Sequence, residues 1–209
     1  MLYSKDVLVE LVKINMEEGF SDTLYWEIEK SAGVGIESYI ESKLPEAITQ
    51  VFLVAPDTLL PHVDATDLLI PEKHQNGSGQ ILLPKDVLRF TLLKMKGWDR
   101  AATIVYDPNS SVAMLQKNPY TMAGRAKPVV VLKNGNNGDK ILCYYSLPPE
   151  VRKHEIEEAL YVKIPDLNVP IEIPELLLPS ITYLTASIVF DILGDTERSA
   201  LMRSHVSIG

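Results

Sequence analysis

The stretch VLRFTLLKMK, residues 87–96, alternates apolar and polar side chains and then slips by one position. Leu88, Phe90 and Leu92 alternate with Arg89 and Thr91, after which the apolar side passes to Leu93 and Met95. Alternation with a single slip is typical of a half-buried strand that carries a β-bulge. A helix beginning at Pro84 is the competing interpretation, because periodicity does not exclude it.

Strand and turn signals continue on both sides of this stretch. Residues 81–84 form a short apolar run closed by proline, and the patterns at 101–106, 129–132 and 141–145 predict strands. Residues 157–164 are compatible with either helix or strand. Residues 134–138 read NGNNG, which favours a hairpin loop because Asn and Gly tolerate positive φ. Prolines punctuate the same region. The sequence therefore predicts a β-rich middle region over residues 56–174.

Helical periodicity marks the N-terminal quarter. Ser4 is a candidate N-cap for a helix that ends at Gly19 and whose apolar residues are Val7, Leu8, Leu11 and Ile14. A second short helix is expected over 22–33. A third is expected before Pro45, and Pro45 then fits the first turn of a renewed helix that ends near Pro56.

The C-terminal segment also predicts helix. Pro179 can occupy a first turn, Gly194 can end the helix and Asp195 can cap a final short one, and the apolar stripe between them consists of Ile181, Leu184, Ile188 and Ile192. The expected fold class is α+β: a helical bundle formed by residues 1–55 and 175–209, with the β-rich region 56–174 inserted as one structural unit. Its shared core should contain Leu8, Leu11, Ile181, Leu184 and Ile188.

The composition of the chain excludes several classes of protein. The chain has 209 residues, a net charge of -8 and one cysteine, Cys143, so an internal disulfide framework is excluded. No apolar run approaches the ~20 residues of a membrane span, and the N-terminus lacks the order of a signal peptide. We therefore expect a soluble protein from a reducing cytosol.

Charge is distributed unevenly along the chain. Residues 1–80 hold 14 acids and 5 bases, residues 81–154 hold 5 and 12, and residues 155–209 hold 9 and 3. A basic segment between acidic ones can bind nucleic acid or pair with an acidic surface of a neighbouring subunit. It can equally be a set of solvated lysines on strand edges. The candidate basic patch consists of Arg89, Lys94, Lys96 and Arg100.

No pattern of residues points to a reaction. There is no dinucleotide fingerprint, phosphate loop or nucleophile elbow. His62, Asp64 and Asp67 match no common metal spacing, and His154 lacks the second histidine of a zinc helix. We therefore expect neither catalytic residues nor a metal or cofactor. An enzyme with an unrecognised site stays open, and a deep pocket that places His62, Asp64 or His154 beside another titratable group would favour it.

Three stretches, taken in order, resemble a known family. They are SYIESKLPEAI at 38–48; LLPKDVLRF at 82–90 with MKGW at 95–98, QKNPYT at 116–121 and Lys127-Pro128; and 179–186 running into ILGDTERSA at 192–200. This order resembles the head-to-tail connector proteins of tailed phages, the adaptor or neck-ring components beneath the portal. It is most similar to the ring proteins of crAss-like phages. The Asn/Gly-rich loop at 134–138 departs from the pattern.

The resemblance implies a non-enzymatic virion protein, made in the host cytoplasm and located in the neck between capsid and tail. It implies a ring of twelve copies that contacts the portal and adjoining tail or ring proteins and passes double-stranded DNA without sequence specificity. The resemblance implies no contact of the protein with a membrane. Segregated charges suit the side-to-side contacts of such a ring. The alternative is a nucleic-acid-binding module that uses the basic segment 81–154.

The C-terminal residues are a second candidate contact. Residues 203–209 lack periodicity and are expected to form a free tail. Our hypothesis is that residues 200–209 become ordered only against a partner ring, and the alternative is a solvated end without a role. In connector proteins of the resembled family the C-terminal segment commonly reaches toward the portal. The residues predicted to make that contact are Arg203, His205, Val206 and Ile208.

Overall fold

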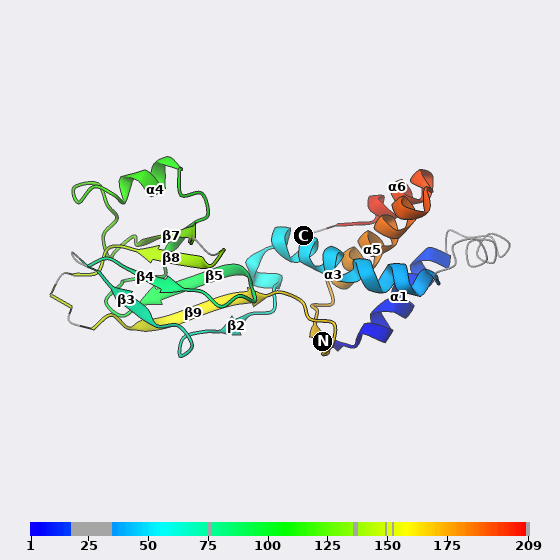
Figure 1. Ribbon diagram of the computed structural model, residues 1–209, viewed down its shortest axis with the longest axis horizontal. Helices are drawn as coiled ribbons and strands as arrows, with labels where there is room; N and C mark the ends of the chain where they lie inside the picture. The colour runs from blue at the N-terminus through cyan, green and yellow to red at the C-terminus, as the bar shows by residue number, and fades with distance from the viewer. Residues whose placement is uncertain (18–34, 75–76, 136–137, 149, 152, 208–209) are drawn as a thin grey trace. The chain divides into compact units, whose positions relative to one another are not determined.

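The computed structural model describes residues 1–17, 35–74, 77–135, 138–148, 150–151 and 153–207 (Figure 1). It confirms the mixed α+β class. The chain divides into two compact units: residues 1–61 with 164–209, and residues 62–163. The sequence placed the two boundaries at 55/56 and 174/175. The expected short helix over 22–33 lies outside the described residues.

The first unit is helical and is organised around one central helix. It contains α1 (Lys5–Glu17), α3 (Ile36–Val54), α5 (Leu178–Leu193) and α6 (Thr196–Ser204), with the 3-10 turn η1 (Asp57–Leu59) and the two-stranded pair β1 (Leu2–Tyr3) and β10 (Ile171–Glu172). Helix α5 packs against α1, α3 and α6. Most of its residues between Ser180 and Phe190 are buried, as expected for a helix surrounded by others.

The predicted ends of α5 and α6 are confirmed. Pro179 lies in the first turn of α5, where its missing N–H costs nothing. Gly194 ends the helix at φ 81°, a left-handed conformation that suits glycine. The Asp195 carboxylate then accepts a hydrogen bond from the Arg198 N–H at 3.0 Å and caps α6.

The apolar faces of the helices differ in part from those predicted. In α1, Leu8 is buried but Val7 and Ile14 are 47% and 53% exposed, and the buried face is completed by Val9, Val12 and Met16. In α5, Ile181 and Leu184 are buried and Ile192 is 44% exposed. Leu11 and Ile188 are half-buried. Helix α1 is therefore rotated relative to the prediction, because several of its sides carry apolar residues.

Helix α3 is continuous through Pro45, so the predicted break is wrong. Pro45 has no N–H to donate to the carbonyl of Glu41, but Glu41 is exposed and water can satisfy that oxygen. Both halves of the helix bury the same face, on which Leu44 and Ile48 are fully buried. Burial of a continuous apolar face outweighs the loss of one helical hydrogen bond.

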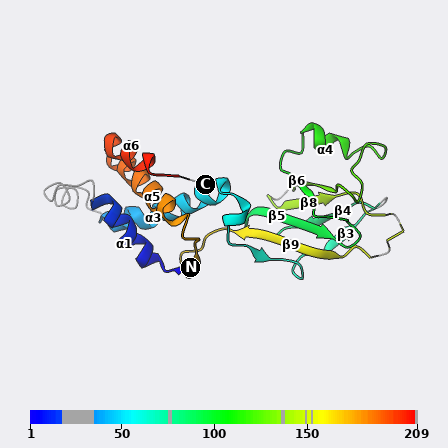
Figure 2. The same cartoon turned by 180° about the vertical axis from the view of Figure 1, so that it is seen from behind.

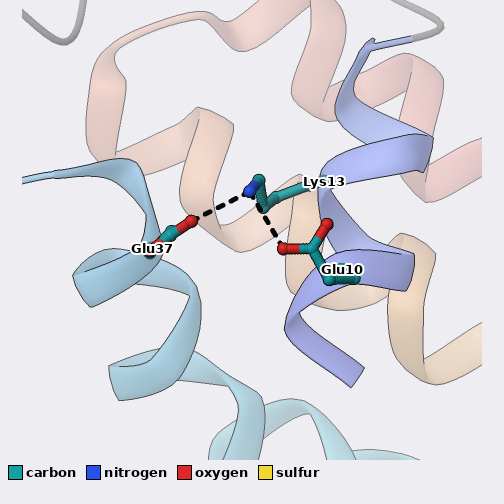
Figure 3. A network of polar contacts seen from close by, with 3 residues as sticks. All are labelled: Glu10, Lys13 and Glu37. Atoms are coloured by element: carbon teal, nitrogen blue, oxygen red, sulfur yellow. Dashed lines mark hydrogen bonds and ion pairs between the residues drawn. The ribbon is translucent and has the colours of Figure 1, made fainter. Parts of the chain in front are cut away.

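One ion network joins α1 to the beginning of α3 (Figure 3). The Lys13 ammonium lies 2.9 Å from a carboxylate oxygen of Glu37 and 3.0 Å from one of Glu10. These hydrogen bonds raise the pKa of Lys13, and the pKa of Glu37 is lowered by the bond from Lys13. Both carboxylates are exposed, so solvent screens these pairs and they add little to stability. The unit is held together mainly by packing against α5.

The second unit consists of two sheets with a shared core. The larger sheet has the order β3 (Pro71–Lys73), β4 (Gly79–Leu82), β8 (Lys140–Tyr144), β7 (Val129–Asn134) and β6 (Thr103–Val105). Its strands are antiparallel except for the parallel pair β6–β7. The smaller sheet is β2 (Val63–Asp64), β9 (Ile156–Lys163) and β5 (Val87–Met95). The core draws on both sheets, including Ile81, Leu142, Phe90 and Leu93.

The opening stretch forms strand β5, so the helical alternative is wrong. The pairing with β9 is irregular, as the predicted bulge implies, but the shift lies between Phe90 and Leu92, before the predicted slip from Leu92 to Leu93. Further shifts lie near each end of the strand. Residues 156–163 form strand β9, which resolves that ambiguity. The expected hairpin joins β7 to β8, and Gly138 adopts φ 79° in its loop. Residues 136 and 137 lie outside the described residues.

We predict that Ile181→Ala will lower the free energy of unfolding of the helical unit by about 2–5 kcal/mol, because it opens a cavity in a fully buried site. Ile192→Ala is the matched control on the same helix and should cost no more than about 0.5 kcal/mol. Urea denaturation followed by circular dichroism at 222 nm measures both. Equal losses from the two substitutions would contradict the central placement of α5.

Candidate functional site

The candidate basic patch lies beside acidic residues of its own sheet. Strands β5 and β9 are antiparallel, and the Lys94 ammonium lies 2.5 Å from a carboxylate oxygen of Glu157. Lys96 and Lys153 both contact Glu155, at 2.6 and 2.7 Å. Hydrogen bonds from these two lysines lower the pKa of Glu155 to about 2, and the bond to Glu155 raises the pKa of Lys96. The charges of Lys94 and Lys96 are thus matched within the unit.

The other two predicted bases lie elsewhere. Arg89 is half-buried in β5, at the position paired with Val162. Arg100 is exposed, beyond the turn at Gly97 and next to Asp99, whose N–H donates to the carbonyl of Arg125. Lys94 and Lys96 are therefore ion-paired with glutamates of the same unit. Arg89 and Arg100 lie at separate positions. The sequence missed this because the register that brings β9 against β5 is not visible along the chain.

Charge is divided between the two units. Residues 62–163 hold 11 acids and 14 bases, whereas residues 1–61 and 164–209 hold 17 acids and 6 bases. The net charges are +3 and -11. Glu155 and the two acids of β9, Glu157 and Glu158, belong to the β unit, which lowers the excess of bases expected from residues 81–154 alone. The helical unit is the strongly charged one.

The chain segment that connects β6 to β7 forms a surface that was not predicted from the sequence. We call residues 107–128 the arm; it contains the short helix α4 (Ser111–Leu115) and projects to one side of the larger sheet in both views (Figures 1 and 2). Ala113 packs in a small core with Val129 and Val131. The Tyr120 side chain is 97% exposed, and the bases of the arm, Lys117, Arg125 and Lys127, are exposed with it.

A buried polar cluster lies in the core of the β unit. The Tyr144 hydroxyl is 2.7 Å from Nδ1 of His154, and both residues are buried. Burial raises the pKa of Tyr144, so the hydroxyl keeps its proton, and the Glu72 carbonyl lies within 3.5 Å as an acceptor for it. Gly79 makes room for that hydroxyl, since a Cβ there would lie 2.2 Å from it. Trp98 packs edge-on to Tyr144 and is buried.

The cluster has an incomplete set of hydrogen bonds. Nε2 of His154 and Nε1 of Trp98 have no hydrogen-bond partner among the described residues. Burial, together with repulsion from Lys73, lowers the pKa of His154. The lowered pKa favours the neutral imidazole in the folded state, hydrogen-bonded to the Tyr144 hydroxyl inside the core.

The other candidates for chemistry are at the surface. His62 and Asp64 are exposed, and the Asp64 carboxylate accepts a 2.9 Å hydrogen bond from the backbone N–H of Thr66. Hydrogen bonds from Thr66 lower the pKa of Asp64. Within the described ranges, no group of three or more His, Cys, Asp or Glu side chains is placed to hold a metal ion. No described helix is both long and apolar enough to cross a bilayer.

The C-terminal segment contacts the helical unit, so the prediction of a free tail is wrong for the described residues. Met202 is buried, and Arg203 pairs with Asp191 at 3.3 Å. The His205 ring stacks on Tyr183 with the ring centroids 5.0 Å apart. The Ser180 hydroxyl donates to the carbonyl of Ser207 at 2.5 Å. Val206 is half-buried, and Ile208 lies outside the described residues.

We predict that the β unit becomes less stable as the pH falls below about 6.5, the ordinary pKa of histidine. Below that pH the unfolded chain protonates His154 while the folded state, whose pKa is lower, does not, so acid favours unfolding. The measurement is urea denaturation between pH 7.5 and 5.5, followed by Trp98 fluorescence in a Trp26→Phe background. His154→Gln should flatten this dependence. An unchanged pH dependence in that variant would contradict the assignment.

The sequence matches no protein-family model, and no curated protein matches it. The proposals below therefore rest on the residues of this chain.

Proposed function

We propose that this protein is a structural virion protein that assembles into a connector ring in the neck of a tailed phage. The ring joins the capsid portal to the tail and extends the DNA channel, with twelve copies as the expected stoichiometry. The order of the three motif stretches supports this assignment. In this proposal the terminal helices form the body of each subunit as a bundle, and the β-rich middle is an insertion in it.

The observation that carries the proposal is the division of charge between the two units, -11 and +3. A ring with head-to-tail contacts joins two different surfaces of each subunit, so opposite charges can meet at every interface without self-complementarity. Because Lys94 and Lys96 are paired within their own sheet, we assign the subunit contact to exposed bases outside β5, among them Arg100 and Lys117.

The C-terminal residues have a modified role in this proposal. Arg203, His205 and Val206 lie on or next to α6 and are held against α5. A portal or neighbouring ring would then bind a preformed surface, without ordering of a free tail. Deleting residues 202–209 would remove buried Met202, so substitutions at Arg203 and His205 are the cleaner test.

A nucleic-acid-binding module remains the second candidate function. The observation that favours it is Tyr120, an almost fully exposed aromatic ring on the arm that also carries Lys117 and Lys127. Bases and aromatic rings together bind single strands by charge and stacking. The acidic helical unit opposes this function. Binding to an oligonucleotide that falls steeply with salt, with no self-association, would favour it over the ring.

We expect the purified protein to form closed oligomers of uniform mass, a fixed multiple of 23.3 kDa, with twelve copies in the complete ring. Raising the salt concentration should weaken assembly, because exposed charges are screened over ~10 Å at 0.1 M. Native mass spectrometry and sedimentation velocity measure both effects. A protein that stays monomeric at low salt and at high concentration would contradict the proposal.

A further inference from the structure

The arm is an ordered projection. The Ser110 hydroxyl accepts a hydrogen bond from the Ala113 N–H and caps α4. The buried Gln116 amide donates to the carbonyl of Val112 and accepts from the N–H of Ala123, both at 2.9 Å. The hydroxyl of Ser146, which follows β8, donates to the carbonyl of Ala123. The arm therefore has a defined shape of its own.

The arm exposes large apolar side chains beside positive charges. Its large exposed apolar side chains are Val112, Met114, Leu115 and Tyr120. Lys117 and Lys127 are exposed on the same segment, and Arg125 lies 3.8 Å from Asp99. A single exposed apolar side chain is ordinary, but several on one short segment together with bases are typical of a protein-binding surface. We call these apolar side chains, together with Lys117 and Lys127, the arm surface.

Helix α1 carries an apolar stripe that begins beside an acid. Val7 and Ile14 are exposed, and half-buried Leu11 lies between them one helical turn from each. Exposed Asp6 is next to Val7, whereas Glu10 is paired with Lys13 and Lys5 with Glu41. The unit to which the helix belongs has a net charge of -11. We call Val7, Leu11 and Ile14 the α1 stripe. Its buried counterpart, including Leu8 and Val12, already holds α1 in the unit.

We infer that the arm surface of one copy docks on the α1 stripe of a second copy. The match is twofold: apolar side chains meet apolar side chains, and the lysines of the arm surface meet Asp6 and the net negative charge of the helical unit. Tyr120 is the expected anchor, because aromatic residues contribute most to such contacts. The two surfaces differ, so each copy can bind two neighbours, as a ring requires. The inference rests on the proposed self-association.

Site-directed crosslinking tests this contact. In a Cys143→Ala background, one protein carries Val7→Cys and another carries Pro119→Cys, at an exposed position next to Tyr120 that leaves the anchor in place. The two are mixed and treated with a short bis-maleimide. A crosslinked heterodimer should form in several-fold higher yield than with the matched control Leu82→Cys, an exposed position of the β unit outside the arm. The contrary outcome is sought with a single chain that carries both substitutions. If it crosslinks only within chains and never between them, the inference is overturned.

Substitutions that leave the fold unchanged provide a second test. Tyr120→Ala should weaken self-association at least about tenfold. Lys117→Glu should weaken it too, and Asp6→Lys in the other copy should restore part of the loss, whereas Lys85→Glu, the same charge change outside the arm, should have little effect. Thermal melting of each variant verifies its fold.

The outcomes separate this contact from the proposed function. Oligomers that form normally with Tyr120→Ala and Lys117→Glu would overturn the docking site and leave the ring proposal standing. A monomer under all conditions would overturn both. A protein that binds a fluorescent single-stranded oligonucleotide through Lys117 and Tyr120, without self-association, would overturn both and favour the nucleic-acid alternative.

Discussion

The pairing of β5 with β9 is the constraint on which the β unit depends. It joins residues from opposite ends of that unit, and it places Phe90 and Leu93 in the same core as Ala159 and Tyr161. The same register brings Lys94 and Lys96 to the acids of β9. One pairing therefore closes the unit, builds much of its core and neutralises the charge that first suggested a binding surface.

Local signals in the sequence predicted local structure well. Gly194 and the cap at Asp195 each act within a few residues, and both are confirmed. The predicted bulge in 87–96 is also present, although it lies before Leu92 and not after it. The errors concern choices that depend on distant partners. Helix α1 has apolar residues on several sides, so packing against α5 decides which face is buried. Likewise, burial along all of α3 overrides the local tendency of Pro45 to end a helix.

The candidate surfaces were harder to predict than the fold. Arg89, Lys94, Lys96 and Arg100 are close in sequence, but their environments are set by β9, about sixty residues further along the chain. The arm gave no periodic signal, since its helix has five residues and its stability comes from Gln116 and a small apolar core. Exposure of Tyr120 could be recognised only once the surrounding chain was placed.

The parallel pairing of β6 and β7 has a consequence for variation in this chain. Two neighbouring strands that run in the same direction cannot be joined by a tight hairpin, so the chain must cross over between their ends. The arm is that crossover. Its length and outward-facing residues can change while the antiparallel ladders β3–β4–β8–β7 and β2–β9–β5 keep their registers. Homologues should therefore tolerate insertions and changes of binding preference in residues 107–128 more readily than anywhere else in the β unit.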